Sequence, residues 1–311
     1  ARARNLVKVT SGWETDIYSF ALERWSDDGY HSENLILRIY SGDYSKEKST
    51  REFKVMCRLY ETGFPVPKVY YLETDTSIFG KPFVIMEKID GQSMGEILKV
   101  SSEAKRQDLI DLFCKMFVDL HRLDIRPFLL EPSIVPDPSA YVTESPYDHM
   151  TGLLQRFKHR MTSFENHKRA FALFSQVMDW LDEKKSGVLT EGLSLVHLDY
   201  HPYNVLIGRD EKAFVIDWTN STITDYRVDL GWTLLLVSTY GKPEMRNYVL
   251  GRYENLAGSK VANIEYFEVL AAIRRLGSLY LSITQGAEKL GMRPEVATIV
   301  KQQRGHVRAV I

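Results

Sequence analysis

The chain has 311 residues, with 40 basic and 41 acidic side chains, and its formal net charge is -1 at pH 7. This balance offers no excess positive charge to attract nucleic acid or an anionic membrane surface. At 44% hydrophobic and 26% charged residues, the composition is that of a globular protein, which excludes the disordered and fibrous classes. The length predicts one large or two medium domains.

Cysteine usage and hydropathy indicate the cellular compartment in which the protein is expected. Cys57 and Cys114 are too few for a disulfide framework or a cysteine-based zinc site, which favours a reducing compartment. The longest apolar runs, such as residues 233–237, fall far short of the ~20 residues that cross a bilayer. We therefore expect a cytoplasmic protein that binds neither nucleic acid nor a membrane.

The N-terminal part alternates apolar and polar residues with the period of two that is typical of strands. A helical pattern follows from Ser45, a possible N-cap, to Thr62, where Gly63 and the prolines after it end the helix. Two further strands come next. The strands are expected at residues 5–10, 16–25, 34–40, 68–72 and 82–88.

From residue 91 onward the pattern changes to the helical period. A single apolar face runs through residues 101–123, and a segment rich in proline, serine and aspartate at 126–150 is expected to be a long loop. Further helices are expected at 151–161 and 168–184, and again from residue 228. The sequence thus predicts an α+β fold with two lobes, a β-rich lobe over residues 1–90 and a mainly helical lobe over 91–311.

One segment interrupts the helices with two short apolar strands, expected at 204–208 and 213–217 and joined by a polar turn. If residue 208 faces residue 213 across that turn, Asn204 falls opposite Asp217 in the antiparallel pair. An amide oxygen and a carboxylate side by side are ligands that Mg²⁺ takes together with substrate phosphates and water. The sequence therefore predicts a magnesium site at Asn204 and Asp217.

The residues just before this hairpin have the spacing of a kinase catalytic loop, His-x-Asp-x-x-x-x-Asn, in His197, Asp199 and Asn204. Phosphoryl transfer needs a carboxylate, separate from the metal ligands, that orients the attacking hydroxyl, and Asp199 is the candidate. An alternative interpretation makes His197, Asp199 and His201 ligands of a hydrolytic metal on one face of a strand. Pro202 favours a loop and weakens that alternative.

Together with the following segment Val215-Ile216-Asp217-Trp218, this loop resembles the aminoglycoside phosphotransferase and choline kinase superfamily, which has the protein-kinase-like two-lobe fold. His201 is typical of that superfamily, whereas protein kinases usually have lysine there. No glycine follows Asp217, and only about ten residues lead from it to Asp229, too few for a regulated activation loop. A Ser/Thr protein kinase is therefore disfavoured.

The resemblance implies a role for each of these side chains. Asp199 would be the catalytic base, Asn204 and Asp217 the Mg²⁺ ligands, and Asp229 a structural carboxylate. The phosphoryl donor would be ATP or GTP, and the acceptor a hydroxyl of a small molecule. An antibiotic, a sugar, an amino alcohol and an amino acid all remain open as acceptors, because fold does not fix function.

In the N-terminal part the resemblance implies a nucleotide site with a phosphate-contacting residue, its helix partner, a hinge and a phosphate-covering turn. The residues that fall on these positions are Arg38, Glu52, Met86, Glu87, Ile89 and Gly12. Two of them depart from the family pattern. Arg38 stands where lysine is expected, and Gly12 is a lone glycine in a turn that is usually glycine-rich.

Two alternatives follow from these departures. Arg38 and Glu52 could form a plain ion pair that contributes little. The chain could also be a catalytically silent nucleotide-binding or scaffold protein, against which the intact Asp199, Asn204 and Asp217 argue. On its strand Arg38 shares a face with Tyr40, which we expect to be the face over the nucleotide.

Overall fold

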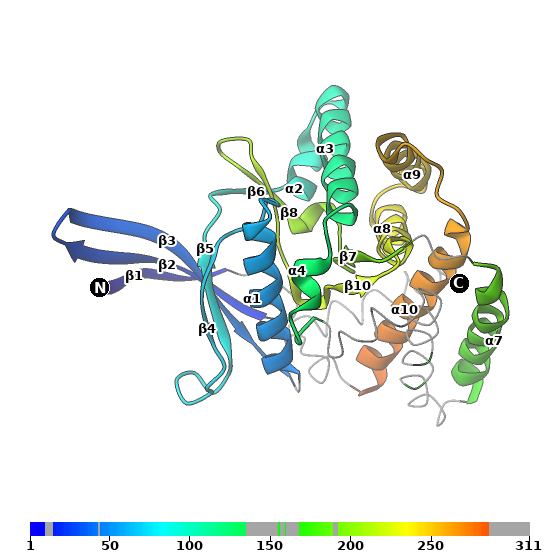
Figure 1. Cartoon of the computed structure of the whole chain (residues 1–311), viewed down its shortest axis with the longest axis horizontal. Helices are drawn as coiled ribbons and strands as arrows, with labels where there is room; N and C mark the ends of the chain where they lie inside the picture. Colours follow the sequence, from blue (N-terminus) through cyan, green and yellow to red (C-terminus); the bar gives the residue numbers. More distant parts are fainter. Residues whose placement is uncertain are drawn as a thin grey trace. The chain divides into compact units, whose positions relative to one another are not determined.

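The computed structural model describes residues 1–9, 15–42, 44–134, 155, 159, 168–188 and 192–285 (Figure 1). These residues form two compact units. Up to residue 280, the first unit comprises residues 1–97 and 203–220, and the second comprises 98–202 and 221–280. Most of the expected helix at 151–161, most of the expected loop at 126–150, and Gly12 lie outside the described residues.

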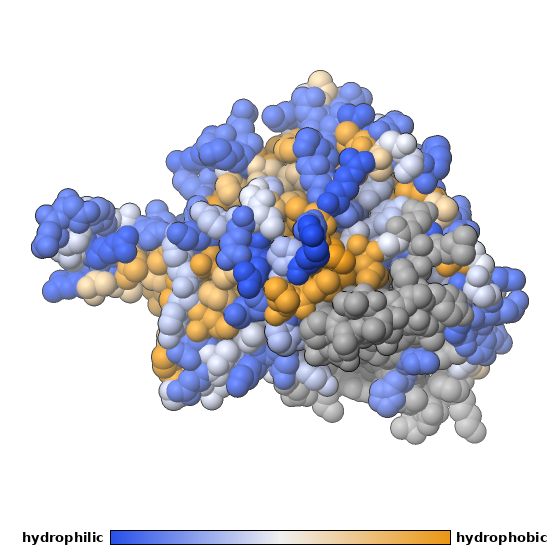
Figure 2. Space-filling model, in the orientation of Figure 1, coloured by the Kyte–Doolittle hydropathy of each residue, from blue (hydrophilic) through white to orange (hydrophobic). Residues whose placement is uncertain are grey.

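A five-stranded antiparallel sheet with the strand order β1-β2-β3-β5-β4 forms the core of the first unit, as the alternation predicts (Figure 1). The hairpin of β2 and β3 is longer than expected, because the pairing continues to a tight turn where Gly29 takes φ = 123°. Figure 2 shows mostly hydrophilic residues at the end of this hairpin, where Trp25 is 62% exposed. The strands are β1 (Arg2–Val9), β2 (Thr15–Ser26), β3 (Gly29–Tyr40), β4 (Val69–Glu73) and β5 (Phe83–Glu87).

Helix α1 (Ser45–Glu61) packs against β3, β4 and β5 through one buried face. The helix has the expected extent, but Ser45 is its first residue and not its N-cap. Tyr44 occupies the cap position and makes no side-chain hydrogen bond there. The buried face includes a carboxylate, Glu52, among apolar side chains, so a charge is placed directly against the sheet.

A second, three-stranded sheet in the first unit consists of β6 (Gly91–Ser93), β8 (Val205–Gly208) and β9 (Ala213–Val215). The two strands expected near 204–208 and 213–217 are confirmed, but the predicted register is wrong by one residue. Gly208 N donates to Lys212 O at 2.8 Å, which leaves a three-residue loop ending in Glu211 with φ = 61°. Three-residue hairpin loops commonly end in a left-handed residue.

This register changes the neighbour of Asn204. Val205 pairs with Val215, and Ile216 N donates to Asn204 O at 3.0 Å, so Asn204 lies opposite Ile216 and not opposite Asp217. A shift of one residue reverses the face on which a strand side chain lies. Asp217 follows beyond the end of β9, where its φ of 69° turns the backbone.

The second unit is mainly helical, around the two-stranded sheet of β7 (Ser194–Val196) and β10 (Thr222–Thr224). Helices α3 and α8 both pack against β7, and α9 packs against α3 and α8. No helix among the described residues is both long and apolar enough to span a membrane. The helices after β6 are α2 (Met94–Val100), α3 (Glu103–His121), α4 (Arg126–Leu129), α7 (Lys168–Lys184), α8 (Tyr226–Tyr240), α9 (Glu244–Ala257) and α10 (Ile264–Gln285).

Two helical glycines of this unit should respond oppositely to alanine. A β carbon at Gly231 of α8 would lie 2.7 Å from the backbone oxygen of Phe267 in α10, whereas nothing lies within 4 Å of one at Gly251 of α9. We expect Gly231→Ala to lower the free energy of unfolding by about 1–3 kcal/mol. Gly251→Ala should raise it by roughly 0.5–1 kcal/mol because helical glycine is replaced without a clash. Urea unfolding followed by circular dichroism measures both, and a Gly231→Ala protein as stable as the parent would contradict the close approach of α8 and α10.

Candidate active site

One buried carboxylate holds the loop that follows β7. Asp229, in the first turn of α8, accepts the backbone N–H of His197 at 2.6 Å and that of Leu198 at 2.8 Å. Leu198 has φ = 60°, a left-handed conformation that costs an ordinary residue about 1–2 kcal/mol. Arg274 Nη2 of α10 donates to the carbonyl of the same residue at 3.3 Å. Charged groups thus hold the Leu198 peptide on both its N–H and its C=O side.

Asp229 has further polar neighbours, although its side chain is fully buried. His121 Nε2 lies 3.4 Å from Asp229 Oδ2, and His121 Nδ1 lies 2.9 Å from the Tyr253 hydroxyl. A buried carboxylate is costly unless hydrogen-bond donors surround it, and these groups supply them. The arrangement suits the structural role that the resemblance implies for Asp229.

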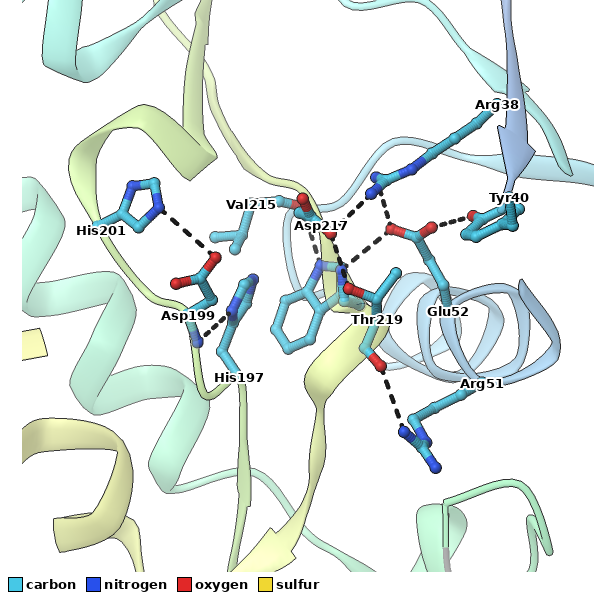
Figure 3. Close-up of polar contacts among 11 residues, drawn as sticks. Arg38, Tyr40, Arg51, Glu52, His197, Asp199, His201, Val215, Asp217 and Thr219 are labelled. Atoms are coloured by element: carbon cyan, nitrogen blue, oxygen red, sulfur yellow. Dashed lines mark hydrogen bonds and ion pairs between the residues drawn. The ribbon is translucent and has the colours of Figure 1, made fainter. Parts of the chain in front are cut away.

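Asp199 lies in this loop with hydrogen-bond donors near both its carboxylate oxygens. Trp232 Nε1 of α8 donates to Oδ1 at 3.2 Å, and His201 Nε2 lies 3.7 Å from Oδ2. The backbone N–H of Asp199 donates to His197 Nδ1 at 3.2 Å, which assigns that ring nitrogen as an acceptor (Figure 3). The Asp199 side chain is 31% exposed, so a substrate group can reach it.

These neighbours set the charge state of Asp199. Partial burial opposes ionisation, but the two histidines and the indole N–H of Trp232 outweigh it and hold the pKa of Asp199 below its usual range. The carboxylate is therefore ionised throughout the physiological pH range. Such a carboxylate accepts a hydrogen bond from a hydroxyl and so orients that hydroxyl. Its low pKa makes it a weak proton acceptor before the reaction begins.

In the first unit, a buried arginine joins two carboxylates. Arg38 Nη1 of β3 donates to Glu52 Oε1 at 2.9 Å, and its Nη2 donates to Asp217 Oδ1 at 2.7 Å (Figure 3). Glu52 also accepts the Tyr40 hydroxyl and, at 3.1 Å, the backbone N–H of Trp218. Burial raises the pKa of Glu52, and the positive charge of Arg38 opposes that rise. Arg38 is 7% exposed, so its ion pair with Glu52 is buried and does not lie on the surface.

Asp217 and Asn204 have the chemistry of a partial metal site. Asp217 is 34% exposed, and its Oδ1 accepts from Thr219 Oγ1 at 3.0 Å as well as from Arg38. No group of three or more acidic, histidine or cysteine side chains able to hold a metal occurs among the described residues. One carboxylate and one amide suit an ion that keeps waters and binds substrate phosphates, which is the habit of Mg²⁺.

The remaining nucleotide-site candidates lie at the end of β5. Met86 and Glu87 are its last two residues; Met86 is buried, whereas Glu87 and Ile89 are half-buried. The strand that the metal-hydrolase alternative requires ends at Val196, so its three ligands do not share a strand face. Gly12 is among the residues that the structure does not describe.

Sequence reasoning did not identify two residues that contact the loop after β7, Trp232 and Arg274. Trp232 is a core residue at 5% exposure, but its ring N–H reaches Asp199. A signal was present, because Trp232 lies one helical turn after Asp229 and so on the same face of α8. Arg274 is 76 positions from Leu198, and no local pattern marks it.

Comparison with known proteins gives one family match. The model of the phosphotransferase enzyme family matches residues 6–262. The chain is 28% identical over 181 residues to acyl-CoA dehydrogenase family member 11 of Pongo abelii, covering 56% of this chain and 21% of that protein. It is 24% identical over 276 residues to family member 10 of Mus musculus, covering 82% of this chain and 24% of that protein. The chain thus spans about a fifth to a quarter of the length of these curated relatives.

Solved structures show the same fold at low identity. Plasmodium vivax ethanolamine kinase has a TM-score of 0.62 and 14% identity, covering 98% of this chain and 81% of that chain. Aminoglycoside phosphotransferase APH(4)-Ia has a TM-score of 0.61 and 16% identity, covering 99% of this chain and 93% of that chain. A mutant of the latter forms a ternary complex with AMP-PNP and hygromycin B.

The buried Asp229 gives a test of how the loop is held. In Asp229→Asn the amide nitrogen cannot accept, so one of the two backbone N–H groups loses its partner, and we expect a loss of about 1–3 kcal/mol in the free energy of unfolding. Asp119→Asn is the matched control, because Asp119 is exposed and pairs with Lys115 of the same helix. That change should cost at most about 0.5 kcal/mol. Equal stability losses in the two variants, measured by urea unfolding, would contradict the role given to Asp229.

Proposed function

Because the chain belongs to the phosphotransferase enzyme family, we propose that it transfers the γ-phosphoryl group of ATP or GTP to a hydroxyl of a small molecule. The observation that carries this proposal is the ionised, partly exposed carboxylate of Asp199 in a loop whose backbone is fixed by Asp229. A carboxylate held in this way can orient an acceptor hydroxyl and receive its proton.

Asp199 acts mainly by orientation. In phosphoryl transfer the bond to the leaving group is largely broken before the new bond is complete, so the hydroxyl proton is lost late. A base with a lowered pKa is adequate for a late transfer, and its fixed position contributes more than its basicity. The hydrogen bonds around Asp199 supply that position.

Asn204 and Asp217 are the residues that would hold Mg²⁺. Bound Mg²⁺ supplies positive charge that offsets the charge of the nucleotide phosphates. Arg38 would add a second cationic contact, because its Nε is buried and has no hydrogen-bond partner among the described residues. A buried, unpaired guanidinium N–H is costly and suits an anionic ligand such as a phosphate.

We place the nucleobase at the segment that follows β5. The backbone N–H of Glu87 already donates to Lys68 O at 2.8 Å, and that of Lys88 donates to a carbonyl of β3 at 3.2 Å. The next residue with a backbone N–H is Ile89, which lies beyond the sheet. The carbonyl of Glu87 and the N–H of Ile89 are therefore our proposed contacts to the base, with the buried side chain of Met86 behind it.

The acceptor is to be found with a panel of hydroxyl compounds. Ethanolamine and hygromycin B represent the compounds named with the structural neighbours. Simple sugars and hydroxy amino acids extend the panel, and hydroxylated acyl-CoA thioesters belong in it because the curated relatives are named as acyl-CoA dehydrogenases. Turnover of ATP and GTP with Mg²⁺ is measured against each compound, with phosphorylated product identified by mass spectrometry. No phosphorylated product with any compound would favour the catalytically silent alternative.

Asp199→Asn tests the base directly on the acceptor that the panel identifies. The amide cannot accept the hydroxyl proton, so kcat should fall by roughly 10²–10⁴-fold. Nucleotide affinity, measured by calorimetry, should stay within about twofold, because the proposed role of Asp199 is toward the acceptor hydroxyl and not toward the nucleotide. Asp210→Asn is the control, because Asp210 is an exposed residue of the β8–β9 hairpin. Near-parent kcat in Asp199→Asn would remove Asp199 from the reaction.

Arg38 tests the nucleotide site through two variants. Arg38→Ala leaves Glu52 as a buried carboxylate without its guanidinium, so we expect a stability loss of about 3–5 kcal/mol together with a higher nucleotide KM and a lower kcat. Arg38→Lys keeps the charge but loses the fork that reaches both Glu52 and Asp217, and should retain partial activity. Unchanged kinetics in a folded Arg38→Lys protein would show that the bidentate arrangement is not needed.

A further inference from the structure

We propose that Trp232, held in place by Arg274, is the residue that positions the catalytic carboxylate of Asp199 and selects which of its oxygens receives the acceptor proton. This inference rests on the proposed function, because it concerns the base of that reaction. Three observations carry it: the hydrogen bond from the indole to the carboxylate, the cation stacked on the indole ring, and the spacing of Asp229 and Trp232 along α8.

The first is the hydrogen bond from the indole. Trp232 is 5% exposed, and a buried indole N–H needs an acceptor. Its Nε1 donates to Asp199 Oδ1 at 3.2 Å, so rotation of the carboxylate about its last bond breaks this contact. Oδ1 is therefore engaged in a hydrogen bond within the protein. Oδ2, which lies 3.7 Å from His201 Nε2, is then the oxygen that receives the proton of the acceptor hydroxyl.

The second is a cation stacked on the indole. The guanidinium carbon of Arg274 lies 4.2 Å from the centroid of the Trp232 ring, within the range of a cation–π interaction. The same guanidinium donates to the carbonyl of Leu198, the residue directly before Asp199. Arg274 of α10 therefore restrains both the indole ring that donates to Asp199 and the peptide group that precedes Asp199.

The third is the spacing along α8. Asp229 and Trp232 are three positions apart, so their side chains lie on one face of the helix, one turn from each other. Asp229 fixes the loop backbone at His197 and Leu198, and Trp232 fixes the side chain of the next residue. Helix α8 therefore holds both the backbone of the loop that carries Asp199 and the side chain of Asp199. Misplacement of a reacting group by about 1 Å can cost roughly 10²-fold in rate.

The kinetic test removes the donor and keeps an aromatic face for Arg274. In Trp232→Phe we expect kcat to fall by roughly 10–100-fold with little change in the nucleotide KM. Trp232→His, which restores a ring N–H, should recover part of that loss. Trp25→Phe is the matched control in the exposed hairpin end and should behave as the parent. A parent-like kcat in folded Trp232→Phe would overturn the proposal.

The pH profile supplies a readout that a merely structural role would not move. The indole bond stabilises the ionised carboxylate, so its loss should raise the pKa of Asp199 and shift the acidic limb of kcat/KM to higher pH. The charged or titratable groups that the described residues place around Asp199 and its loop include His197, His201, Asp229 and Arg274. All four remain in Trp232→Phe, so a shift reports the lost indole bond. An acidic limb at the parent position would count against the proposal.

A spectroscopic test needs no turnover. The five tryptophans give five indole N–H resonances, and the one from Trp232 is assigned by its loss in Trp232→Phe. We expect this resonance to move in Asp199→Asn, because the acceptor loses its charge, and to move in Arg274→Gln, because the stacked cation is removed. An unmoved resonance in Asp199→Asn would show that the bond does not form in solution.

These measurements separate the two proposals. Retained turnover in Asp199→Asn refutes the assignment of Asp199 as the base, and with it the proposed function of this loop. An inactive Asp199→Asn beside a parent-like Trp232→Phe refutes the positioning role alone. Where Trp232→Phe fails to fold, Arg274→Gln decides, since it leaves the indole in the core. It should lower kcat and leave nucleotide affinity unchanged, and a parent-like kcat in that variant overturns the proposal.

Discussion

The buried carboxylate of Asp229 is the group on which the loop after β7 depends. It accepts two consecutive backbone N–H groups, and the second belongs to a leucine with a positive φ angle. The isolated loop would not keep that conformation, because a left-handed leucine is strained. The charge of Asp229 would in turn not be tolerated in the core without its donors. Loop and carboxylate therefore stabilise each other, and the position of Asp199 follows from both.

A second buried charge organises the first unit. Arg38 reaches Glu52 with one nitrogen and Asp217 with another, which the planar fork of arginine permits and the single ammonium of lysine does not. The replacement of the lysine typical of the superfamily is thus accompanied by a contact that uses the arginine geometry. Asp217 also lies past the end of β9 at a positive φ, so its carboxylate is placed by this contact and by Thr219, not by strand pairing.

The chain has the fold of the phosphotransferase family, and its structural neighbours include proteins named for ethanolamine and for aminoglycosides. One fold therefore serves acceptors of different chemistry, as is general for widely used folds. The part that these proteins have in common with this chain is the fold. The acceptor is a separate question, and it depends on residues around the shared scaffold.

Local patterns in the sequence were sufficient for most of the elements, and they marked the segment with the His-x-Asp-x-x-x-x-Asn spacing as a candidate site. The antiparallel strands, α1 and α7 follow from the period of their apolar residues, because burying one face of a strand or helix is a local requirement. The register of the β8–β9 hairpin did not follow, because it depends on whether the turn has three or four residues. That was decided by Glu211 adopting a left-handed conformation.

The partners of Asp199 and Leu198 were also decided only in the tertiary structure. Trp232 and Arg274 lie 33 and 76 positions from the residues that they contact. Helical spacing places Trp232 on the same face of α8 as Asp229, but it does not say which residue that face contacts. Contacts of this kind depend on how α8 and α10 pack, and that packing comes from the whole fold.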